Sequence, residues 1–372
     1  MNYVKLKDVC TINMGQSPSS DSYNENGHGV PFFQGNADFG ERYPVTRKWC
    51  SAPTKIAAPE DILISVRAPI GAMNYAKEEC CIGRGLAALT PNREKVAPEY
   101  IFWLLKGKNE ELNCKGTGST FKAIGRNILE ETLVPNISLE KQTECSIILE
   151  KVYRVILSRK QQLQKLDELV KARFVEMFED GMSPLKNIDE LCYCIVDCPH
   201  TTPKYEGELK NPAIRTSEIK KGTIVWDTMR YVSDDEYLER TARLVPKAGD
   251  IVYGREGTFG NAAILPEGYK FCLGQRVMLL RPDYFKCTSE YLLYAVISDY
   301  VYNQVLEKNN ASTVAHVNVK DVKQFRIPLP PLSKQKQFTR FIKQIDKSKA
   351  AVQKALDEAQ LMFDSLMQKY FG

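Results

Sequence analysis

Side chains that form directed hydrogen bonds recur in short loops between the β-like runs of this sequence. Arginine can bond bidentately to guanine, asparagine or glutamine can do so to adenine, and lysine, serine and threonine bind phosphate oxygens. The candidates in residues 1–135 are Gln16, Ser17, Gln34, Asn36, Arg67, Arg84, Ser119, Thr120 and Lys122. The candidates in residues 181–328 are His200, Thr201, Thr202, Lys204, Arg215, Ser217, Arg255, Gln275, Arg276, Ser312, Thr313 and His316. These residue types are the ones that DNA recognition requires, and the alternative for each is a solvated or turn-stabilising role.

Some of these candidates occupy matching loops in the two halves of the chain. The matched pairs are Ser17 with Thr202, Arg84 with Gln275, Ser119 with Ser312, and Thr120 with Thr313. Because both halves place a polar side chain in the same loop, these positions are the stronger candidates.

Motifs for catalysis are absent from the sequence. It contains no [DNS]-P-P-[YFW] methyltransferase motif, no glycine fingerprint after a strand and no G-x-x-x-x-G-K-[ST] phosphate loop. The stretch GTGST (116–120) lacks the lysine of such a loop, so we interpret it as a plain turn or a phosphate contact. The sequence has only three histidines, which gives histidine catalysis little support. Cys192, Cys194, Cys198 and His200 lack the C-x2-C spacing of a zinc knuckle, so no metal site is predicted.

The candidate loops belong to a sequence that is written twice. EDILISVRAPIGAM (60–73) matches GDIVYGREGTFGNA (249–262), and GSTFKAIGRNILEETLVP (118–135) matches ASTVAHVNVKDVKQFRIP (311–328). From Ser119 onward the offset between the copies is a constant 193 residues. Each copy has short β-like runs separated by Gly, Pro, Asn and Asp, and then one long helical segment.

A proline stop precedes each long helix. RIPLPPLSKQKQF (326–338) repeats the arrangement of LVPNISLEKQTEC (133–145). The prolines exclude an earlier helix start, and Ser138 and Ser333 can cap the first helical turn.

Apolar residues then recur at alternating steps of three and four along both helices, which is the heptad pattern of a coiled coil. The predicted seam consists of Leu149, Val152, Ile156, Leu163, Leu166, Val170, Ile342, Ile345, Val352, Leu356, Phe363 and Leu366. Arg159, Arg173 and Lys349 interrupt this seam, and we interpret them as positions that set the register or break the symmetry. We expect the helices to pair antiparallel as a spacer between the two globular domains, which we call heads. The alternative is two surface helices, each packed on its own domain.

Composition is that of an ordinary globular protein with two or more domains. The 372 residues are 43% hydrophobic and 26% charged, and their formal net charge of +5 permits polyanion binding without requiring it. No apolar run approaches the roughly 18 residues of a membrane span, and MNYVKLKDVC lacks the apolar core of a secretion signal. The eleven cysteines are expected to be free thiols in a cytoplasmic protein.

The order of these features resembles the specificity subunits of type I restriction-modification systems. The resemblance rests on KLKDVCTINMGQSP (5–18), VPNISLEKQ (134–142), CPHTTPKY (198–205) and the P-L-P-P-L-x-x-Q helix entry at 328–335. It implies an α+β fold in which a tandem pseudo-twofold repeat carries two β-rich target-recognition domains, separated by an antiparallel two-helix coiled coil. The expected segments are recognition domain 1 (1–135), spacer helix 1 (136–180), recognition domain 2 (181–328) and spacer helix 2 (329–372).

The resemblance also implies the function and the partners. Each recognition domain would read one half of a split double-stranded DNA target, and the chain itself would catalyse nothing. Two methyltransferase subunits and two restriction subunits would dock on it. They would hold the S-adenosylmethionine, ATP and Mg²⁺ that adenine N6 methylation and ATP-dependent cleavage need. The alternatives are an orphan DNA-binding or regulatory protein and a helical scaffold whose heads bind protein.

Overall fold

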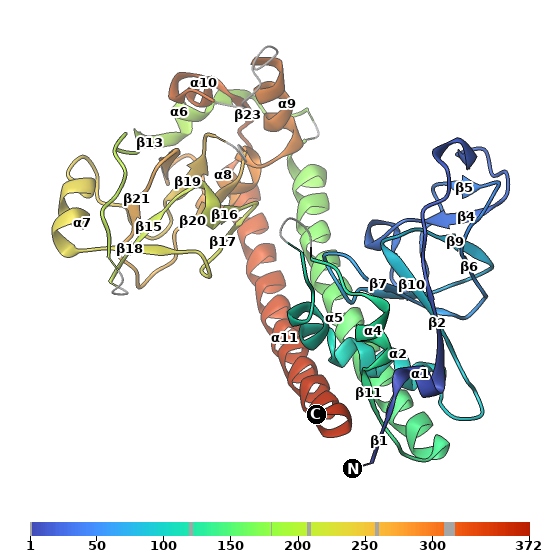
Figure 1. The fold of residues 1–372 in the computed structure, drawn as a ribbon. Coiled ribbons are helices and arrows are strands. Elements are labelled where there is room, and N and C mark those ends of the chain that lie inside the picture. Colours follow the sequence, from blue (N-terminus) through green and yellow to red (C-terminus); the bar gives the residue numbers. More distant parts are fainter. Residues whose placement is uncertain (1, 119–121, 180, 207–209, 257–259, 309–316) are drawn as a thin grey trace. The chain divides into compact units, whose positions relative to one another are not determined.

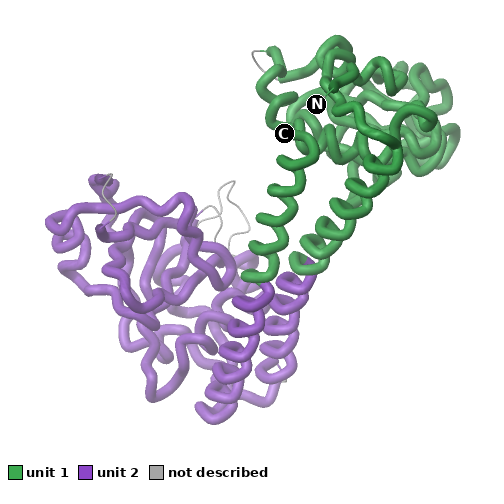
Figure 2. Tube along the Cα trace, turned by 90° about the horizontal axis from the view of Figure 1, so that it is seen from below, with its two compact units in different colours: residues 1–160, 353–372 green, residues 161–352 purple. Residues whose placement is uncertain are grey.

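The computed structural model describes residues 2–118, 122–179, 181–206, 210–256, 260–308 and 317–372 (Figure 1). Ser119, Thr120, Ser312, Thr313 and His316 of the predicted DNA contacts lie outside these residues. The chain divides into two compact units (Figure 2). Unit 1 comprises Met1–Lys160 and Gln353–Gly372, and unit 2 comprises Gln161–Val352.

A four-stranded antiparallel sheet is the main sheet of unit 1, with the order β2-β10-β7-β8. Its strands are β2 (Cys10–Met14), β10 (Leu86–Pro91), β7 (Ile62–Ser65) and β8 (Met73–Tyr75). All four residues of β7 are buried, which explains why this strand reads as a continuous apolar run rather than an alternating one.

A second sheet of unit 1 has the order β3-β5-β4-β9-β6, and β4 pairs with β9 in parallel. Its strands are β3 (Tyr23–Asn24), β5 (Trp49–Cys50), β4 (Val30–Phe33), β9 (Cys80–Ile82) and β6 (Ile56–Ala57). A short pair joins β1 (Tyr3–Lys5) to β11 (Leu133–Pro135), so it closes the two ends of the head against each other. The helical elements are α1 (Leu6–Val9), η1 (Ser20–Ser22), η2 (Asn36–Asp38), α2 (Pro98–Gly107), α3 (Asn109–Cys114) and α4 (Arg126–Glu130).

Unit 2 has a main sheet of the same connectivity, with the order β13-β22-β19-β20. Its strands are β13 (Cys192–Asp197), β22 (Val277–Pro282), β19 (Ile251–Gly254) and β20 (Ala262–Ile264). A second sheet has the order β14-β18-β15-β21, and there β15 pairs with β21 in parallel.

The remaining elements of unit 2 flank these sheets. The other strands are β12 (Leu185–Asn187), β14 (Tyr205–Glu206), β15 (Asn211–Ile214), β16 (Ile219–Lys220), β17 (Thr223–Ile224), β18 (Arg230–Val232), β21 (Cys272–Leu273) and β23 (Arg326–Pro328). The helical elements are α6 (Ile188–Leu191), η3 (Thr216–Glu218), α7 (Asp234–Thr241), α8 (Ser289–Val296), α9 (Asp299–Lys308) and α10 (Val319–Gln324). The mixed helix-and-strand class predicted from the sequence is confirmed.

Two long helices, α5 (Leu139–Phe178) and α11 (Leu332–Phe371), contain 40 residues each. Their first residues lie 193 positions apart, and so do their last. Ser138 caps α5, because its Oγ accepts a hydrogen bond from the backbone N–H of Lys141 at 3.4 Å. The predicted capping role of Ser333 is wrong, since this residue already lies inside the first turn of α11.

Within unit 1, the start of α5 lies against the end of α11. The Phe363 ring lies 6.0 Å from Tyr153 and 5.7 Å from the fully buried Trp103 of α2. Phe371 lies 5.1 Å from Tyr100 of the same helix α2. The last residues of the chain therefore complete the core of the unit that contains the first residues.

Within unit 2, the end of α5 lies against the start of α11. Phe174 and Phe178 pack on Phe338 at ring distances of 5.6 and 5.3 Å. Further along α11, Lys349 forms an ion pair with Asp167 of α5. Within unit 2 the two helices therefore run antiparallel. All twelve predicted seam residues are buried or half-buried.

The glutamine of each helix entry anchors its helix to the preceding head. Gln142 accepts a hydrogen bond from the backbone N–H of Ala97 at 2.8 Å and donates one to the Ile137 carbonyl at 2.9 Å. Gln335 accepts from the N–H of Thr288 at 3.0 Å and donates to the Pro330 carbonyl at 2.8 Å. Both side chains are buried, so the glutamine in each proline-stopped entry has a structural role. The division at residues 135, 180 and 328 stays a prediction.

Candidate nucleic-acid interface

The ends of three neighbouring strands define one edge of the main sheet in each unit. In unit 1 Met14, the last residue of β2, pairs with Ala87, and Ser65, the last residue of β7, pairs with Leu86. The antiparallel register thus places the loops after β2 and β7 beside the loop before β10. In unit 2 the corresponding pairs are Asp197 with Met278 and Gly254 with Val277. We call this the reading edge of each unit.

A depression of about 240 Å³ lies on the reading edge of unit 1. It brings together four predicted contacts, Gln34, Asn36, Arg67 and Arg84. Arg67 and Arg84 are exposed, and within the described part of the chain neither forms an ion pair with a carboxylate. Two exposed guanidinium groups therefore line a concave site that can bind hydrogen-bond acceptors.

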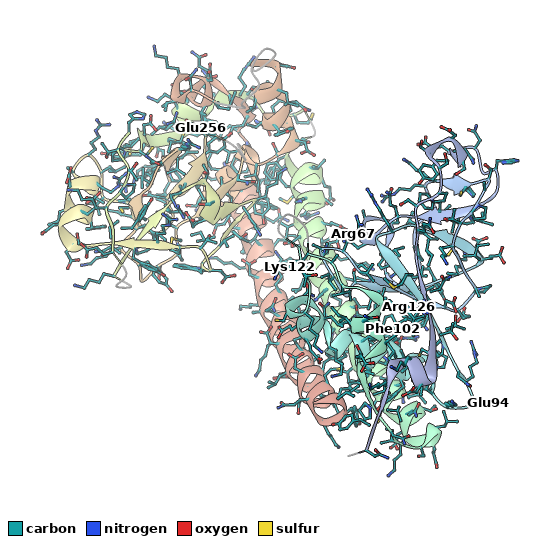
Figure 3. The ribbon with its side chains drawn as sticks, in the orientation of Figure 1. Arg67, Glu94, Phe102, Lys122, Arg126 and Glu256 are labelled. Carbon is teal, nitrogen blue, oxygen red and sulfur yellow. The ribbon has the colours of Figure 1, made fainter. Side chains whose placement is uncertain are left out.

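The other described candidates of unit 1 lie on the same edge. Arg84 donates its backbone N–H to the Ser17 hydroxyl at 3.4 Å, and the N–H of Gln16 bonds to the Ile82 carbonyl at 3.0 Å. Ala68 donates its N–H to the Lys122 carbonyl at 3.0 Å, so the loop of Lys122 adjoins that of Arg67 (Figure 3). All seven described candidates of unit 1 therefore converge on one edge.

Close backbone contacts of glycine hold this edge together. A Cβ atom on Gly15 would approach the carbonyl oxygen of Gly83 to 2.2 Å, and one on Gly85 would approach that of Gln34 to 2.3 Å. Contacts this short are impossible for any larger residue. The glycines therefore set how closely the loops that carry Gln34 and Arg84 pack.

A depression of about 250 Å³ lies on the reading edge of unit 2. Its lining includes His200, Arg255, Gln275 and Arg276, all predicted contacts, and also Glu256, which the sequence analysis did not select. The Nε atom of Arg276 lies 3.0 Å from the Glu256 carboxylate. Gln275 donates to the Thr202 hydroxyl at 2.9 Å, which joins two more candidates.

The sequence predicts Arg255 at an exposed loop tip, and this prediction is wrong. Its side chain is only 6% exposed, and its guanidinium lies 2.8 Å from the carboxylate of Asp197. Asp197 in turn lies 3.4 Å from Nε2 of the exposed His200. Arg255 therefore sits beneath the surface and links the ends of β13 and β19.

Arg215 and Ser217 are held by a second acid, which was not among the residues predicted from the sequence. The fully buried Glu218 accepts hydrogen bonds from the backbone N–H of Arg215 at 2.9 Å, from its Nε at 3.0 Å and from the Ser217 hydroxyl at 2.7 Å. The Arg215 guanidinium also lies 5.6 Å from the Tyr205 ring centroid. Burial raises the pKa of the Tyr205 phenol, which the nearby guanidinium of Arg215 opposes.

Arg240 of α7 holds the loop that carries Thr201, Thr202 and Lys204 through hydrogen bonds. This arginine is buried and donates to the Leu273 carbonyl at 2.9 Å and to the Thr201 carbonyl at 3.3 Å. Lys204 is exposed. Arg240 could not be found from the sequence, because nothing in its local pattern distinguishes it from a solvated helix residue.

Metal-binding residues do not cluster in the described part of the chain, where no group of three or more His, Cys, Asp or Glu side chains could hold an ion. All eleven cysteines are free thiols. The β-bulge between Cys192 and Cys194 breaks the alternation that would have pointed both to one face. Among the residues described, no helix has the length and apolarity needed to cross a bilayer.

Comparison with known proteins places both copies in one family. A family model described as a type I restriction modification DNA specificity domain matches residues 1–168 and 207–360. The chain is 22% identical over 361 residues to the type I restriction enzyme MjaIX specificity subunit of Methanocaldococcus jannaschii, which is 88% of this chain and 82% of that protein.

A second relative from the same organism, the putative type I restriction enzyme MjaX specificity subunit, is 41% identical over 160 residues. That match covers 43% of this chain and 38% of the relative's length. Among solved structures, the crystal structure of the type I restriction-modification system S subunit from M. genitalium has a TM-score of 0.60. It is 13% identical, covers 100% of this chain and 96% of its own, and shows a likeness of fold.

Proposed function

Because the chain belongs to the family of type I restriction modification DNA specificity domains, we propose that it reads a two-part DNA sequence with the reading edges of its two units. The observation that carries this proposal is that the same edge, with a depression lined by arginine and glutamine, occurs in both units. The lining differs between the units, which supports two unlike half-sites and an asymmetric target.

The direct base contacts of unit 1 are assigned to the exposed residues of its reading edge. Arg67 and Arg84 supply the bidentate donors that match guanine, and Gln34 and Asn36 supply amides that match adenine. Gln16, Ser17 and Lys122 at the rim are assigned to phosphate, along with Ser119 and Thr120 outside the described residues. In unit 2 the same roles fall to His200, Thr201, Thr202, Lys204, Gln275, Arg276, Ser312, Thr313 and His316. Arg255 is assigned to positioning because it is buried on Asp197, and so are Arg215 and Ser217, because the fully buried Glu218 holds both.

Helices α5 and α11 form the proposed spacer between the half-sites. Their equal length of 40 residues and the apolar contacts in each unit support an antiparallel coiled coil. A rigid spacer matters because two reading edges can engage one duplex only when their separation suits the helical repeat of DNA, about 34 Å per turn.

Chemistry is assigned to partner subunits. Two methyltransferase subunits that hold S-adenosylmethionine and two restriction subunits that use ATP and Mg²⁺ would dock on this chain. What supports a non-catalytic chain is the absence of methyltransferase and phosphate-loop motifs from its sequence. Family membership weighs against the non-DNA scaffold and the orphan regulator.

The deciding experiment maps N6-methyladenine across the host genome with the gene intact and deleted. We expect one split motif, two short half-sites around a fixed gap, to lose methylation on deletion. Exchanging residues 1–135 for those of another specificity subunit should then change one half-site and leave the other. An unchanged methylation pattern after deletion would refute the proposal.

Binding to duplex DNA gives an independent measurement. Because the predicted rim contacts neutralise phosphates, log K should fall linearly with log salt, with a slope near −0.9 for each phosphate contact. Lys122→Ala should weaken binding to all sequences alike and reduce this slope by about 1.

A further inference from the structure

The depressions of the two reading edges occupy equivalent positions in the fold, yet they differ in charge. In unit 1, Arg67 follows β7 by two residues and Gly85 directly precedes β10; in unit 2, Glu256 follows β19 by two residues and Arg276 directly precedes β22. The same backbone hydrogen bond fixes both places. Val66 donates to the Gly85 carbonyl at 2.9 Å, and Arg255 donates to that of Arg276 at 3.0 Å.

Unit 2 therefore presents an acid beside a guanidinium at the place where unit 1 presents a cation and a glycine. Glu256 is half-buried at 27% exposure, whereas Arg276 is 64% exposed. The contact between them engages Nε of Arg276. Next to it, the ion pair of the buried Arg255 with Asp197 links the end of β13 to the loop that carries Glu256.

The backbone at Arg276 adds a second observation. Its φ of 64° lies in the left-handed region, where a residue other than glycine costs roughly 1–2 kcal/mol. Glycine would avoid this cost at this position. Non-glycine residues held in this conformation cluster at functional sites. The strain thus indicates that the side chain of Arg276 has a use that glycine could not serve.

An arginine beside a glutamate matches one base pair in the major groove. Guanine presents two acceptors there, N7 and O6, and its cytosine presents the N4 amino donor next to them. A guanidinium supplies two donors and a carboxylate supplies one acceptor, in the complementary order. An A·T pair would instead set the thymine O4 acceptor and methyl group against these side chains.

Building on the proposed function, we propose that the pair Glu256–Arg276 reads one G·C base pair in the half-site of unit 2. Arg276 bonds the guanine, and Glu256 both orients Arg276 and accepts from the cytosine amino group. Unit 1 has Arg67 in place of Glu256 and therefore has no carboxylate at this position. Glu256 and Arg276 are thus specificity-determining residues of unit 2.

The test maps N6-methyladenine in cells that carry the full chain with its own partner subunits. The variants are Glu256→Ala, Arg276→Ala and, as a control on an exposed carboxylate of α7, Glu239→Gln. Both alanine variants should relax the same G·C pair in one half-site and leave the other half-site unchanged, and the control should leave both unchanged. With purified complex and duplex DNA of the mapped motif, replacing this pair by A·T should weaken wild-type binding about 5- to 100-fold. The same replacement should weaken binding of the variants less than about twofold.

Each other result has a defined meaning. If the wild-type complex methylates no split motif, the proposed function fails. If a motif is found but the two alanine variants leave it intact, relax different pairs or relax an A·T pair, reading by Glu256–Arg276 is overturned while the function stands. If both alanine variants abolish methylation, Arg276→Gln decides by the same duplex comparison, because its amide cannot form the bidentate bond to guanine. A Gln variant that melts like wild type and still rejects A·T as strongly overturns the inference.

Discussion

Individual charged residues in this protein are divided by burial into exposed ones, which are the proposed DNA contacts, and buried ones, which hold the loops in place. Arg67, Arg84 and Arg276 are exposed on the reading edges, whereas Arg255 and Arg240 are buried and held by partners. A buried charge needs its counter-charge, because removing the partner leaves an ion without solvent. The same residue type therefore has opposite roles a few residues apart, and mutations should separate them.

The first prediction concerns the pair Arg281–Asp250 in the main sheet of unit 2. Arg281 donates to both carboxylate oxygens of Asp250, at 2.8 and 2.7 Å, and Asp250 is only 2% exposed. Arg281→Met should destabilise the protein by about 3 kcal/mol, because it leaves the buried carboxylate unpaired. Thermal unfolding measures this change, with the exposed Arg243→Met as control. The double variant with Asp250→Asn should recover part of the loss, and no recovery would contradict the pairing argument.

Thiol reactivity gives the second prediction. Burial raises the pKa of Cys10, Cys80, Cys272 and Cys287 to about 12, so these thiols stay protonated far above neutral pH. Because the thiolate is the reactive form, alkylation at pH 8 should label the exposed Cys114 first and these four last. Mass spectrometry of peptides measures the order, and denatured protein should lose it. Rapid labelling of the four in the native protein would contradict their burial.

At the scale of elements, the two glutamines explain why a polar residue follows each proline stop so closely. Gln142 forms hydrogen bonds with the backbone N–H at the start of α2 and with a backbone carbonyl just before α5. Gln335 forms the same two bonds at the start of α8 and just before α11. Buried polar groups of the backbone must find partners. The glutamine therefore ties each head to the start of its long helix.

The third prediction follows from these bonds. Gln335→Leu should leave the Thr288 N–H and the Pro330 carbonyl without partners and cost about 3 kcal/mol, since each buried unsatisfied group costs about 1–3 kcal/mol. This should lower the melting temperature by about 6 °C or more. Gln337→Leu, two residues away and exposed, is the matched control. Equal melting temperatures for the two variants would contradict the anchoring role.

At the scale of the whole molecule, unit 1 is built from two separate segments of the chain, whereas unit 2 is one continuous segment. Unit 1 takes residues 353–372 from the chain end, and unit 2 contains the first part of α11. The rings of Phe363 and Phe371 contact α2 and α5 within unit 1. The stability of the first head therefore depends on residues that lie more than 200 positions away in the sequence.

The fourth prediction tests this dependence. Deleting residues 353–372 should destabilise unit 1, because Trp103 and Tyr100 lose their contacts with Phe363 and Phe371, while the sheets of unit 2 keep their packing. Hydrogen exchange should rise in α2 of unit 1 but not in β19 of unit 2, and a synthetic peptide of residues 353–372 should restore the protection. Leu361→Ala, at a side chain that is 73% exposed, should leave the exchange unchanged. Unaltered exchange in α2 after the deletion would refute the prediction.

Much of the candidate site could be predicted because hydrogen-bonding side chains in loops are visible in a sequence. The described candidates of unit 1 converge on one edge, and Gln275, Arg276 and His200 do so in unit 2. Glu256, Asp197 and Glu218 were missed. An acid that pairs with an arginine across a loop has no local signature, since its partner is set by strand register and not by sequence spacing.

The sequence by itself determined the elements of local origin. Prolines at 135, 328, 330 and 331 exclude helix, and the heptad pattern beyond them specifies two helices with one apolar face. Turn residues between apolar runs likewise mark the strands. These signals depend on neighbours within a few residues, so no tertiary contact is needed to read them.

Only the tertiary structure decided which charges are paired and which are exposed. Arg255 and Arg276 are both arginines in loops next to strands, so the local sequence does not distinguish them. Arg255 is nevertheless buried on Asp197, whereas Arg276 is 64% exposed beside Glu256. The tertiary structure also decided that the chain end completes unit 1. The physical reason is that burial and ion pairing are set by residues brought together from distant strands, so their energies belong to the packed fold and not to any local segment.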